Sequence, residues 1–251
     1  MKCGFHIHSK YSHDCSKDIE SILKYAEENK FDALAITDHN TTAGSIHASK
    51  LSKKIQIIIG AEFSTDMGHI LALNIDKDIE KNCEFKEGKY NFEDIVKEVK
   101  KQGGLLIAAH PYNSKFTKHP EAIGQLHGFE LINGRMISDP FNKKSSQFIE
   151  KLKKMYPEKI WLGSSDAHTL DEINNVFVLS KENNINDVLF SNYDIKYKKT
   201  DYKTIYKNKI NSSNNFKSNF KQRLKYAFSL LNGIKGDKSH ETIRICKKNK
   251  S

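Results

Sequence analysis

Cysteine is scarce in this chain, and its cysteines do not occur in pairs. Cys3, Cys15, Cys83 and Cys246 form no C-x-x-C motif and have no spacing typical of a disulfide framework. The sequence has no apolar run near the roughly 18 residues that a membrane-spanning helix needs. It also has no basic segment followed by an apolar stretch at the N-terminus. These absences predict a reduced, soluble, cytoplasmic protein without a membrane partner.

The length favours one large α/β domain, alone or with a small appendage, because the chain has 251 residues. A chain of this size can bury a full core without disulfides or a structural metal. Any bound metal ion is therefore expected to act in catalysis rather than to stabilise the fold.

The positive charge is concentrated at the C-terminal end. Residues 196–251 contain 16 Lys and Arg against 3 Asp and Glu, whereas residues 1–195 contain 25 against 28. We therefore predict a catalytic domain over residues 1–195 and a basic extension over residues 196–251. Such an extension could bind nucleic acid. A solvated tail also explains the charge, because Lys and Asn are abundant along the whole chain. Within the extension, 211–219 is typical of a loop, and the apolar spacing over 220–231 predicts one amphipathic helix.

Short apolar runs alternate with helical patterns along the first part of the chain. Strands are expected at residues 4–8, 33–37, 55–63, 69–75, 105–109, 128–132, 160–165 and 176–179, the last being the final strand. Helices are expected at residues 16–29, 43–51, 92–101 and 145–155. The alternation indicates buried parallel strands in βα units. Barrel enzymes place their chemistry at the carboxyl ends of such strands.

Histidine and acidic residues recur at these strand ends. His6 and His8 are two residues apart on a strand, so both side chains point to one face. Asp166 and His168 repeat this spacing far along the chain. The remaining members of the set are His39, Glu62, His69 and His110.

Mixed imidazole and carboxylate ligands suit Zn²⁺, Mn²⁺ or Fe²⁺ better than Ca²⁺ or Mg²⁺. The set exceeds what one ion needs, so we expect two or three divalent ions with Glu62 bridging between them. Closely spaced ions lower the pKa of a bridging water and bind both oxygens of a phosphoryl displacement.

The ordered set resembles the PHP (polymerase and histidinol phosphatase) superfamily over residues 1–180. The segments 128–135 and 163–168 resemble the C-terminal segment of its small stand-alone members. The resemblance implies a distorted (β/α)7 TIM-like barrel, a trinuclear metal site and metal-dependent phosphoesterase activity. It implies that a metal-bridging hydroxide attacks phosphorus.

Transferred residue by residue, the resemblance implies three groups of ligands. The first ion would be held by His6, His8, Glu62 and Asp166; the second by Glu62, His69 and His110; the third by Asp14, His39 and His168. The family position at Asp14 can be His or Asp, and Asp14 is preferred here to the neighbouring His13.

Other residues have suggested roles in catalysis. His39, His168 or a metal-bound water could protonate the leaving oxygen. Arg135 could bind a substrate phosphate through its fork of donors, with a surface salt bridge as the alternative. Asp38 could orient His39 or cap the following helix.

We therefore predict a phosphoesterase that hydrolyses a phosphomonoester or phosphodiester in a small metabolite, a nucleotide or a nucleic-acid end. The alternatives are a 5'-3' exonuclease on short RNA or DNA, a histidinol-phosphatase-like enzyme, and a non-catalytic metal-binding module. The complete ligand set disfavours the last. A dedicated histidinol phosphatase is not favoured, because the loop 9–15 resembles that of the general small PHP proteins more than that of the histidinol phosphatases.

Overall fold

The computed structural model describes residues 1–76, 79–113, 115–139, 143–200, 204–207, 236–237 and 239–247. The described helices are α1 (Ile19–Glu28), α2 (Ala43–Leu51), α3 (Phe92–Lys101), α4 (Pro120–Gln125), α5 (Gly134–Ile137), α6 (Lys143–Met155), α7 (Leu170–Ile173) and α8 (Ile185–Val188). The described strands are β1 (Lys2–Ile7), β2 (Ala33–Ile36), β3 (Gln56–Thr65), β4 (Gly68–Leu73), β5 (Phe85–Lys86), β6 (Lys89–Tyr90), β7 (Leu105–Ala108), β8 (Gly128–Asn133), β9 (Ile160–Ser164), β10 (Val176–Ser180), β11 (Tyr193–Tyr197) and β12 (Glu241–Ile245).

Local sequence signals explain where the longer helices begin. Helix α1 starts after Asp18, whose carboxylate accepts a hydrogen bond from Ser21 N. Helix α3 starts after Asn91, whose side chain accepts from Asp94 N. Both contacts satisfy a backbone N–H that has no partner within the helix. Helix α3 also buries one apolar face against the sheet, which contributes more to its stability than propensity does.

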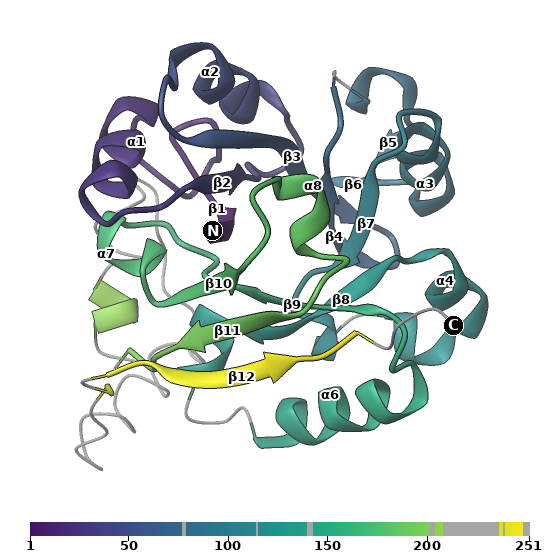
Figure 1. The fold of residues 1–251 in the computed structure, drawn as a ribbon. Coiled ribbons are helices and arrows are strands. Elements are labelled where there is room, and N and C mark those ends of the chain that lie inside the picture. Colours follow the sequence, from purple (N-terminus) through teal and green to yellow (C-terminus); the bar gives the residue numbers. More distant parts are fainter. Residues whose placement is uncertain are drawn as a thin grey trace.

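The strands form one curved sheet in the order β12-β11-β10-β1-β2-β3-β4-β7-β8-β9, with the β5–β6 hairpin beside β3 (Figure 1). The pairs β1–β2, β2–β3, β7–β8 and β8–β9 are parallel, as predicted. The expectation of parallel strands is wrong for β10, which runs antiparallel to both β1 and β11. It is also wrong for β4, which runs antiparallel to both β3 and β7. Only two residues separate β3 from β4, and so short a connection makes a hairpin rather than a crossover.

The sheet closes nearly into a barrel through residues that follow β9. Ser165 N donates to the Phe5 carbonyl at 3.0 Å, and Ala167 N donates to the His6 carbonyl at 3.1 Å. His8 N donates back to the Ala167 carbonyl at 2.9 Å. We call this contact between β1 and residues 165–167 the seam. The closure confirms the predicted α/β TIM-like barrel and places the two ends of the predicted ligand set side by side.

The seam coincides with a change of register in β1. The pairing of β1 with β2 shifts between Gly4 and Ile7, and His6 has a positive φ of 58°. As a result Phe5 packs in the larger apolar cluster, whereas Ile7 packs in a second cluster with α1 and β2. The irregular backbone thus lies at the strand end where the histidines lie.

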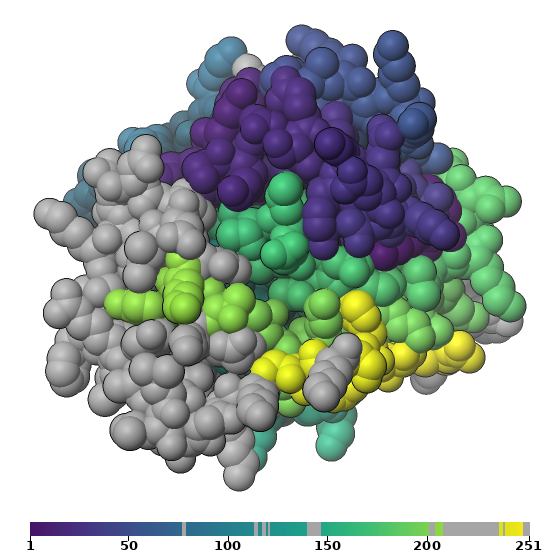
Figure 2. Space-filling view, turned by 90° about the vertical axis from the view of Figure 1, so that its left-hand side faces the viewer, coloured from purple at the N-terminus to yellow at the C-terminus, as the bar shows by residue number. Residues whose placement is uncertain are grey.

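The C-terminal part of the chain adds an antiparallel edge to the barrel sheet. The expectation that residues 176–179 form the final strand is wrong, because β11 and β12 follow β10 and pair in sequence. The predicted boundary at residue 195 lies inside β11. Figure 2 shows β12 in yellow, below the purple N-terminal elements. The loop predicted at 211–219 and the helix predicted at 220–231 lie outside the described residues.

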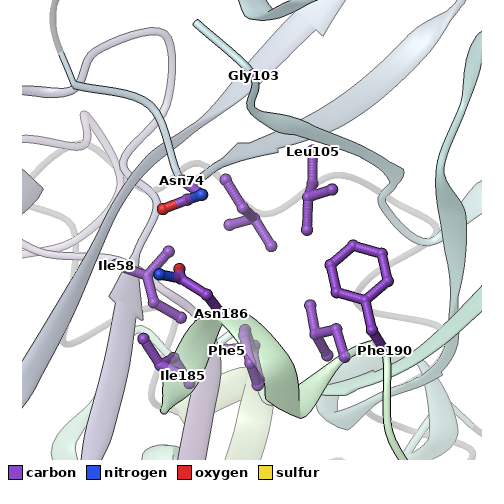
Figure 3. Close-up of a pocket in the computed structure, with 10 residues that line it drawn as sticks. Phe5, Ile58, Asn74, Gly103, Leu105, Ile185, Asn186 and Phe190 are labelled. Atoms are coloured by element: carbon purple, nitrogen blue, oxygen red, sulfur yellow. The ribbon is translucent and has the colours of Figure 1, made fainter.

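A small apolar cavity lies at the end of the barrel opposite to the histidines. Its volume is about 150 Å³, and α8 covers one side of it (Figure 3). Leu105, which begins β7, and Leu73, which ends the antiparallel β4, both line it. The opposite ends of these two strands lie next to the predicted metal ligands His69 and His110.

Among the described residues, no helix has the length and apolarity that crossing a membrane requires.

Candidate metal centre

The nine predicted metal ligands come together at one end of the barrel. They lie in or directly after β1, β2, β3, β7 and β9, at the start of β4, and in the loop after β1. Four groups of them have candidate ligand atoms within 4.8 Å of one another. These groups are His6 with His8 and Glu62; His39 with Glu62 and His69; His6 with His110 and Asp166; and His8 with Asp14, His39 and His168.

The carboxylate of Glu62 lies at the centre of the cluster. Its Oε1 is 2.9 Å from His69 Nδ1 and 3.0 Å from His110 Nε2. Its Oε2 is 3.0 Å from His39 Nδ1, 3.2 Å from His6 Nε2 and 3.4 Å from His8 Nε2. A carboxylate with both oxygens surrounded by imidazoles has the arrangement that a bridging ligand needs.

Electrostatics favour the ionised form of this carboxylate. Burial alone would raise the pKa of Glu62, but the charge of His6 and a hydrogen bond from His110 hold it well below its ordinary value. Burial and the neighbouring charge of His168 lower the pKa of His8 to about 3. His8 is therefore neutral near pH 7, which is the form that can bind a metal.

Asp14 joins the cluster from the loop after β1. Its Oδ2 is 2.8 Å from His168 Nε2 and 3.7 Å from His39 Nε2. The neighbouring His13 belongs to none of the four groups, although its ring centroid is 5.0 Å from that of His39. His8 belongs to two groups, one with Glu62 and one with Asp14, so its geometry does not assign it to a single ion.

Unpartnered polar atoms test whether this cluster suits a cation. His6 Nε2, His8 Nε2, His39 Nδ1 and Asp14 Oδ1 are buried and have no hydrogen bond in the described structure. His6 Nδ1 already donates to Glu130, while His6 Nε2 faces the carboxylates of Glu62 and Asp166. Burial lowers the pKa of His6, but Glu62 and Glu130 raise it well above its ordinary value, so a cation at Nε2, either a proton or a metal ion, is favoured. The donor set therefore fits divalent metal ions.

Glu130 is a supporting residue that the sequence analysis did not identify. Its buried carboxylate accepts His6 Nδ1 at 2.7 Å, His110 N at 2.6 Å and Asn133 Nδ2 at 2.9 Å. It also accepts the Ser164 hydroxyl. In the sequence, the one sign of this role was a charged residue inside the otherwise apolar run 128–132. Such a partner fixes the ring orientation of a ligating histidine.

Asp38 supports the cluster through Ser12. Its Oδ1 accepts the Ser12 hydroxyl at 2.8 Å, and Ser12 Oγ in turn lies 2.9 Å from His8 Nδ1. His39 N donates to the same Ser12 oxygen at 2.9 Å. Helix α2 begins after Thr42 rather than after Asp38. Of the two roles considered for Asp38, the structure favours the orienting one.

Arg135 is buried and points to a carboxylate. Its Nη2 donates to Glu172 Oε2 at 3.1 Å, and the side chain is 9% exposed. No contact of Arg135 tests the predicted phosphate binding, which stays a prediction. Glu172 also escaped the sequence analysis, although Thr169-x-x-Glu172 matches the capping-box pattern at a helix start.

A TIM-like barrel with a buried His/Asp/Glu cluster at its strand ends defines a class of proteins that could bind metal ions there. The family model described as PHP domain matches residues 4–227. The chain therefore belongs to the PHP domain family, as the sequence resemblance predicted.

The chain is similar to two uncharacterised proteins of Methanocaldococcus jannaschii. One is 36% identical over 125 residues, which are 45% of this chain and 69% of the relative. The other is 29% identical over 194 residues, which are 74% of this chain and 73% of the relative. Their descriptions name no activity.

Two solved structures share the fold at low identity. A two-domain Bacteroides vulgatus protein, named as containing a predicted PHP-like metal-dependent phosphoesterase, is 19% identical with a TM-score of 0.57, over 84% of this chain and 69% of that one. A Bifidobacterium adolescentis protein, named as a candidate metal-dependent phosphoesterase, is 17% identical with a TM-score of 0.53, over 66% of this chain and 87% of that one. At these identities the likeness supports the fold alone.

Proposed function

We propose that this protein is a metal-dependent phosphoesterase that hydrolyses a phosphomonoester or phosphodiester. The observation that carries the proposal is the arrangement around Glu62. One buried carboxylate faces the rings of five histidines, and two of those rings, His6 and His8, present buried Nε2 atoms without hydrogen bonds. Membership in the PHP domain family supports the same reaction class.

We further propose that two or three divalent ions, Zn²⁺, Mn²⁺ or Fe²⁺, bind in this cluster. The ligands that the family resemblance implies are His6, His8, Glu62 and Asp166 for one ion, Glu62, His69 and His110 for a second, and Asp14, His39 and His168 for a third. The four groups of neighbouring ligand atoms overlap with these sets without matching them, since His110 groups with His6 and Asp166, and His39 with Glu62 and His69. When bound, such ions would supply the Lewis acidity that activates water and offsets negative charge on phosphoryl oxygens.

The chain's own side chains would orient the ligands and move a proton. Glu130 and the Ser12–Asp38 pair hold His6 and His8 through their Nδ1 atoms, which leaves the Nε2 atoms directed at the cluster. The proposed proton donor to the leaving oxygen is His39, His168 or a water molecule of the metal centre, and a histidine could donate only from a nitrogen that does not bind an ion. The His39 side chain is 13% exposed and that of His168 is 4% exposed, so substrate reaches His39 more easily.

His8→Ala and Asp166→Ala test the proposal. Each should abolish hydrolysis of p-nitrophenyl phosphate and of its bis-ester and should lower the metal content, because each removes a proposed ligand. Circular dichroism should show a retained fold. His47→Ala is the matched control, since His47 contacts Tyr11 and belongs to none of the ligand groups. Full activity in either ligand variant would refute the assignment.

A 5'-3' exonuclease acting on short RNA or DNA is the second candidate, and the basic segment 196–251 supports it. Removing the whole segment would also remove β12 from the barrel sheet. The test is therefore replacement by glutamine, in the full chain, of Lys217, Lys221 and Lys225, three lysines of this segment that recur every four residues. A shallower salt dependence of oligonucleotide binding would support the exonuclease, and an unchanged dependence would favour a small phosphorylated substrate.

A substrate panel with each metal distinguishes the remaining alternatives. It should contain phosphomonoesters including histidinol phosphate, nucleoside bisphosphates and short oligonucleotides. Tight metal binding without turnover of any of these compounds would support the non-catalytic metal-binding module instead.

We propose the cytoplasm as the location of the protein, because Cys3 and Cys15 are buried free thiols.

A further inference from the structure

The turn at residues 166–169 carries two proposed ligands on a backbone that needs support. Asp166 has a φ of 53°, in the left-handed region that side chains other than glycine rarely adopt. Such a conformation persists only where surrounding contacts hold it. Toward β1, the seam supplies backbone hydrogen bonds at Ala167. The support on the other side comes from Glu172.

Glu172 binds the backbone of this turn through one carboxylate oxygen. Its Oε2 accepts His168 N at 2.8 Å and Thr169 N at 3.2 Å. The same oxygen accepts Arg135 Nη2 at 3.1 Å. The Glu172 side chain is 3% exposed, so its charge needs a buried partner, and Arg135 supplies it. Burial lowers the pKa of Arg135, but the carboxylates of Glu172 and Asp166 raise it above its ordinary value.

Arg135 reaches this position because β8 and β9 end side by side. Helix α5 follows β8 directly, and a Cβ at Gly134 would lie only 2.6 Å from the Ser165 carbonyl oxygen. Glycine thus permits α5 to approach the end of β9. Asn133 joins the two elements, since its Oδ1 accepts Arg135 N and its Nδ2 donates to Asp166 Oδ2 at 3.3 Å.

We propose that the buried Arg135–Glu172 ion pair is a positioning device that holds Asp166 and His168 in ligand geometry. The inference rests on the proposed function to the extent that these two residues bind metal. It assigns Arg135 a role different from the phosphate clamp predicted from the sequence. Arg135 acts through Glu172 on the turn, and not on the substrate.

Metal titration of the full chain tests this inference independently of hydrolysis. The variants are Arg135→Met, Glu172→Gln and the double variant, each stripped of metal and titrated with Mn²⁺. Each single change should weaken binding about 10- to 100-fold, as loss of a residue that orients metal ligands does. The double variant should bind no more weakly than the worse single variant, because the two residues act as one unit.

Matched variants separate positioning from general damage. Arg244→Met breaks the exposed Arg244–Asp194 pair and should leave Mn²⁺ affinity unchanged. Arg135→Lys retains the charge and should recover part of the affinity. If a single variant fails to fold because one buried charge is unpaired, the double variant removes both charges and provides the measurement.

Three results would overturn the inference. Wild-type Mn²⁺ affinity in Glu172→Gln would show that the turn does not need the pair. Unchanged Mn²⁺ affinity in Arg135→Met, together with tenfold weaker inhibition by inorganic phosphate, would make Arg135 a phosphate ligand. Absence of metal binding by the wild type would overturn this inference and the proposed function together. If the wild type binds Mn²⁺ but hydrolyses no phosphoester, only the proposed function fails, and the titration still decides about the pair.

Discussion

Replacing Glu130 with glutamine removes a charge that contacts the metal centre only through other residues. The carboxylate accepts His6 Nδ1 at 2.7 Å and His110 N at 2.6 Å, and both donors belong to proposed ligand residues. A hydrogen bond to a charged group contributes about 1.5–3 kcal/mol. Since about 1.4 kcal/mol corresponds to a tenfold change in an equilibrium constant, Glu130→Gln should weaken metal binding about 10- to 100-fold.

The assay is calorimetric titration of metal-free protein with Zn²⁺ or Mn²⁺, with circular dichroism to verify the fold. Glutamine has nearly the same shape as glutamate and keeps one carbonyl acceptor, so the His110 backbone can remain bonded. Glu27→Gln is the control, because Glu27 pairs with Lys54 on the surface. Equal metal affinity in wild type and Glu130→Gln would refute the argument that this carboxylate orients His6.

Two further predictions concern stability. Leu189 is 4% exposed and lines the apolar cavity, so Leu189→Ala should lower the free energy of unfolding in urea by about 2–5 kcal/mol. Hydrolysis by the folded variant should be unchanged, and a loss of activity equal to that of His8→Ala would contradict the separation of the cavity from the site. Burial lowers the pKa of His127 below its ordinary 6.5, and the charge of Lys159 adds to this effect. The folded state then binds a proton less readily than the unfolded chain, so the free energy of unfolding should fall as the pH drops below 6.5. His127→Gln, which keeps an acceptor for Leu106 N, should reduce this slope, and an identical slope in the variant would contradict the assignment.

Much of the secondary structure follows from local pattern. Helices α2 and α3 occupy the predicted residues. Apolar periodicity and the Asn91 cap explain this for α3, whereas α2 buries only the small residues Gly44, Ser45 and Ala48. β12 escaped prediction because its residues are mostly polar and only Ile245 is buried. Its place in the fold depends on pairing with β11, a long-range contact that carries no local signal. The strand β4 was predicted at residues 69–75, but its antiparallel direction was not, since an apolar run does not reveal strand direction.

The site was predictable in composition but not in its internal contacts. Strand-end positions predicted which side chains lie close together, because parallel strands bring their carboxyl ends together, and metal binding by these side chains stays a prediction. They could not show that His8 lies between two ligand groups, which depends on how β1 curves at the seam. Glu130 and Glu172 were missed because each acts through contacts with residues distant in the sequence, His6 and Arg135.

The seam has a thermodynamic consequence for the whole molecule. His6 and His8 stand on one side of it, and Asp166 and His168 on the other, and the backbone hydrogen bonds between them number only a few. An ion held by ligands from both sides would bind the closed barrel and not a barrel opened along this line. By mass action such an ion stabilises the closed form in proportion to the logarithm of its concentration. The metal supply of the cell would then set how firmly residues 165–167, which follow β9, are held against β1, a strand that also pairs with β2 and β10.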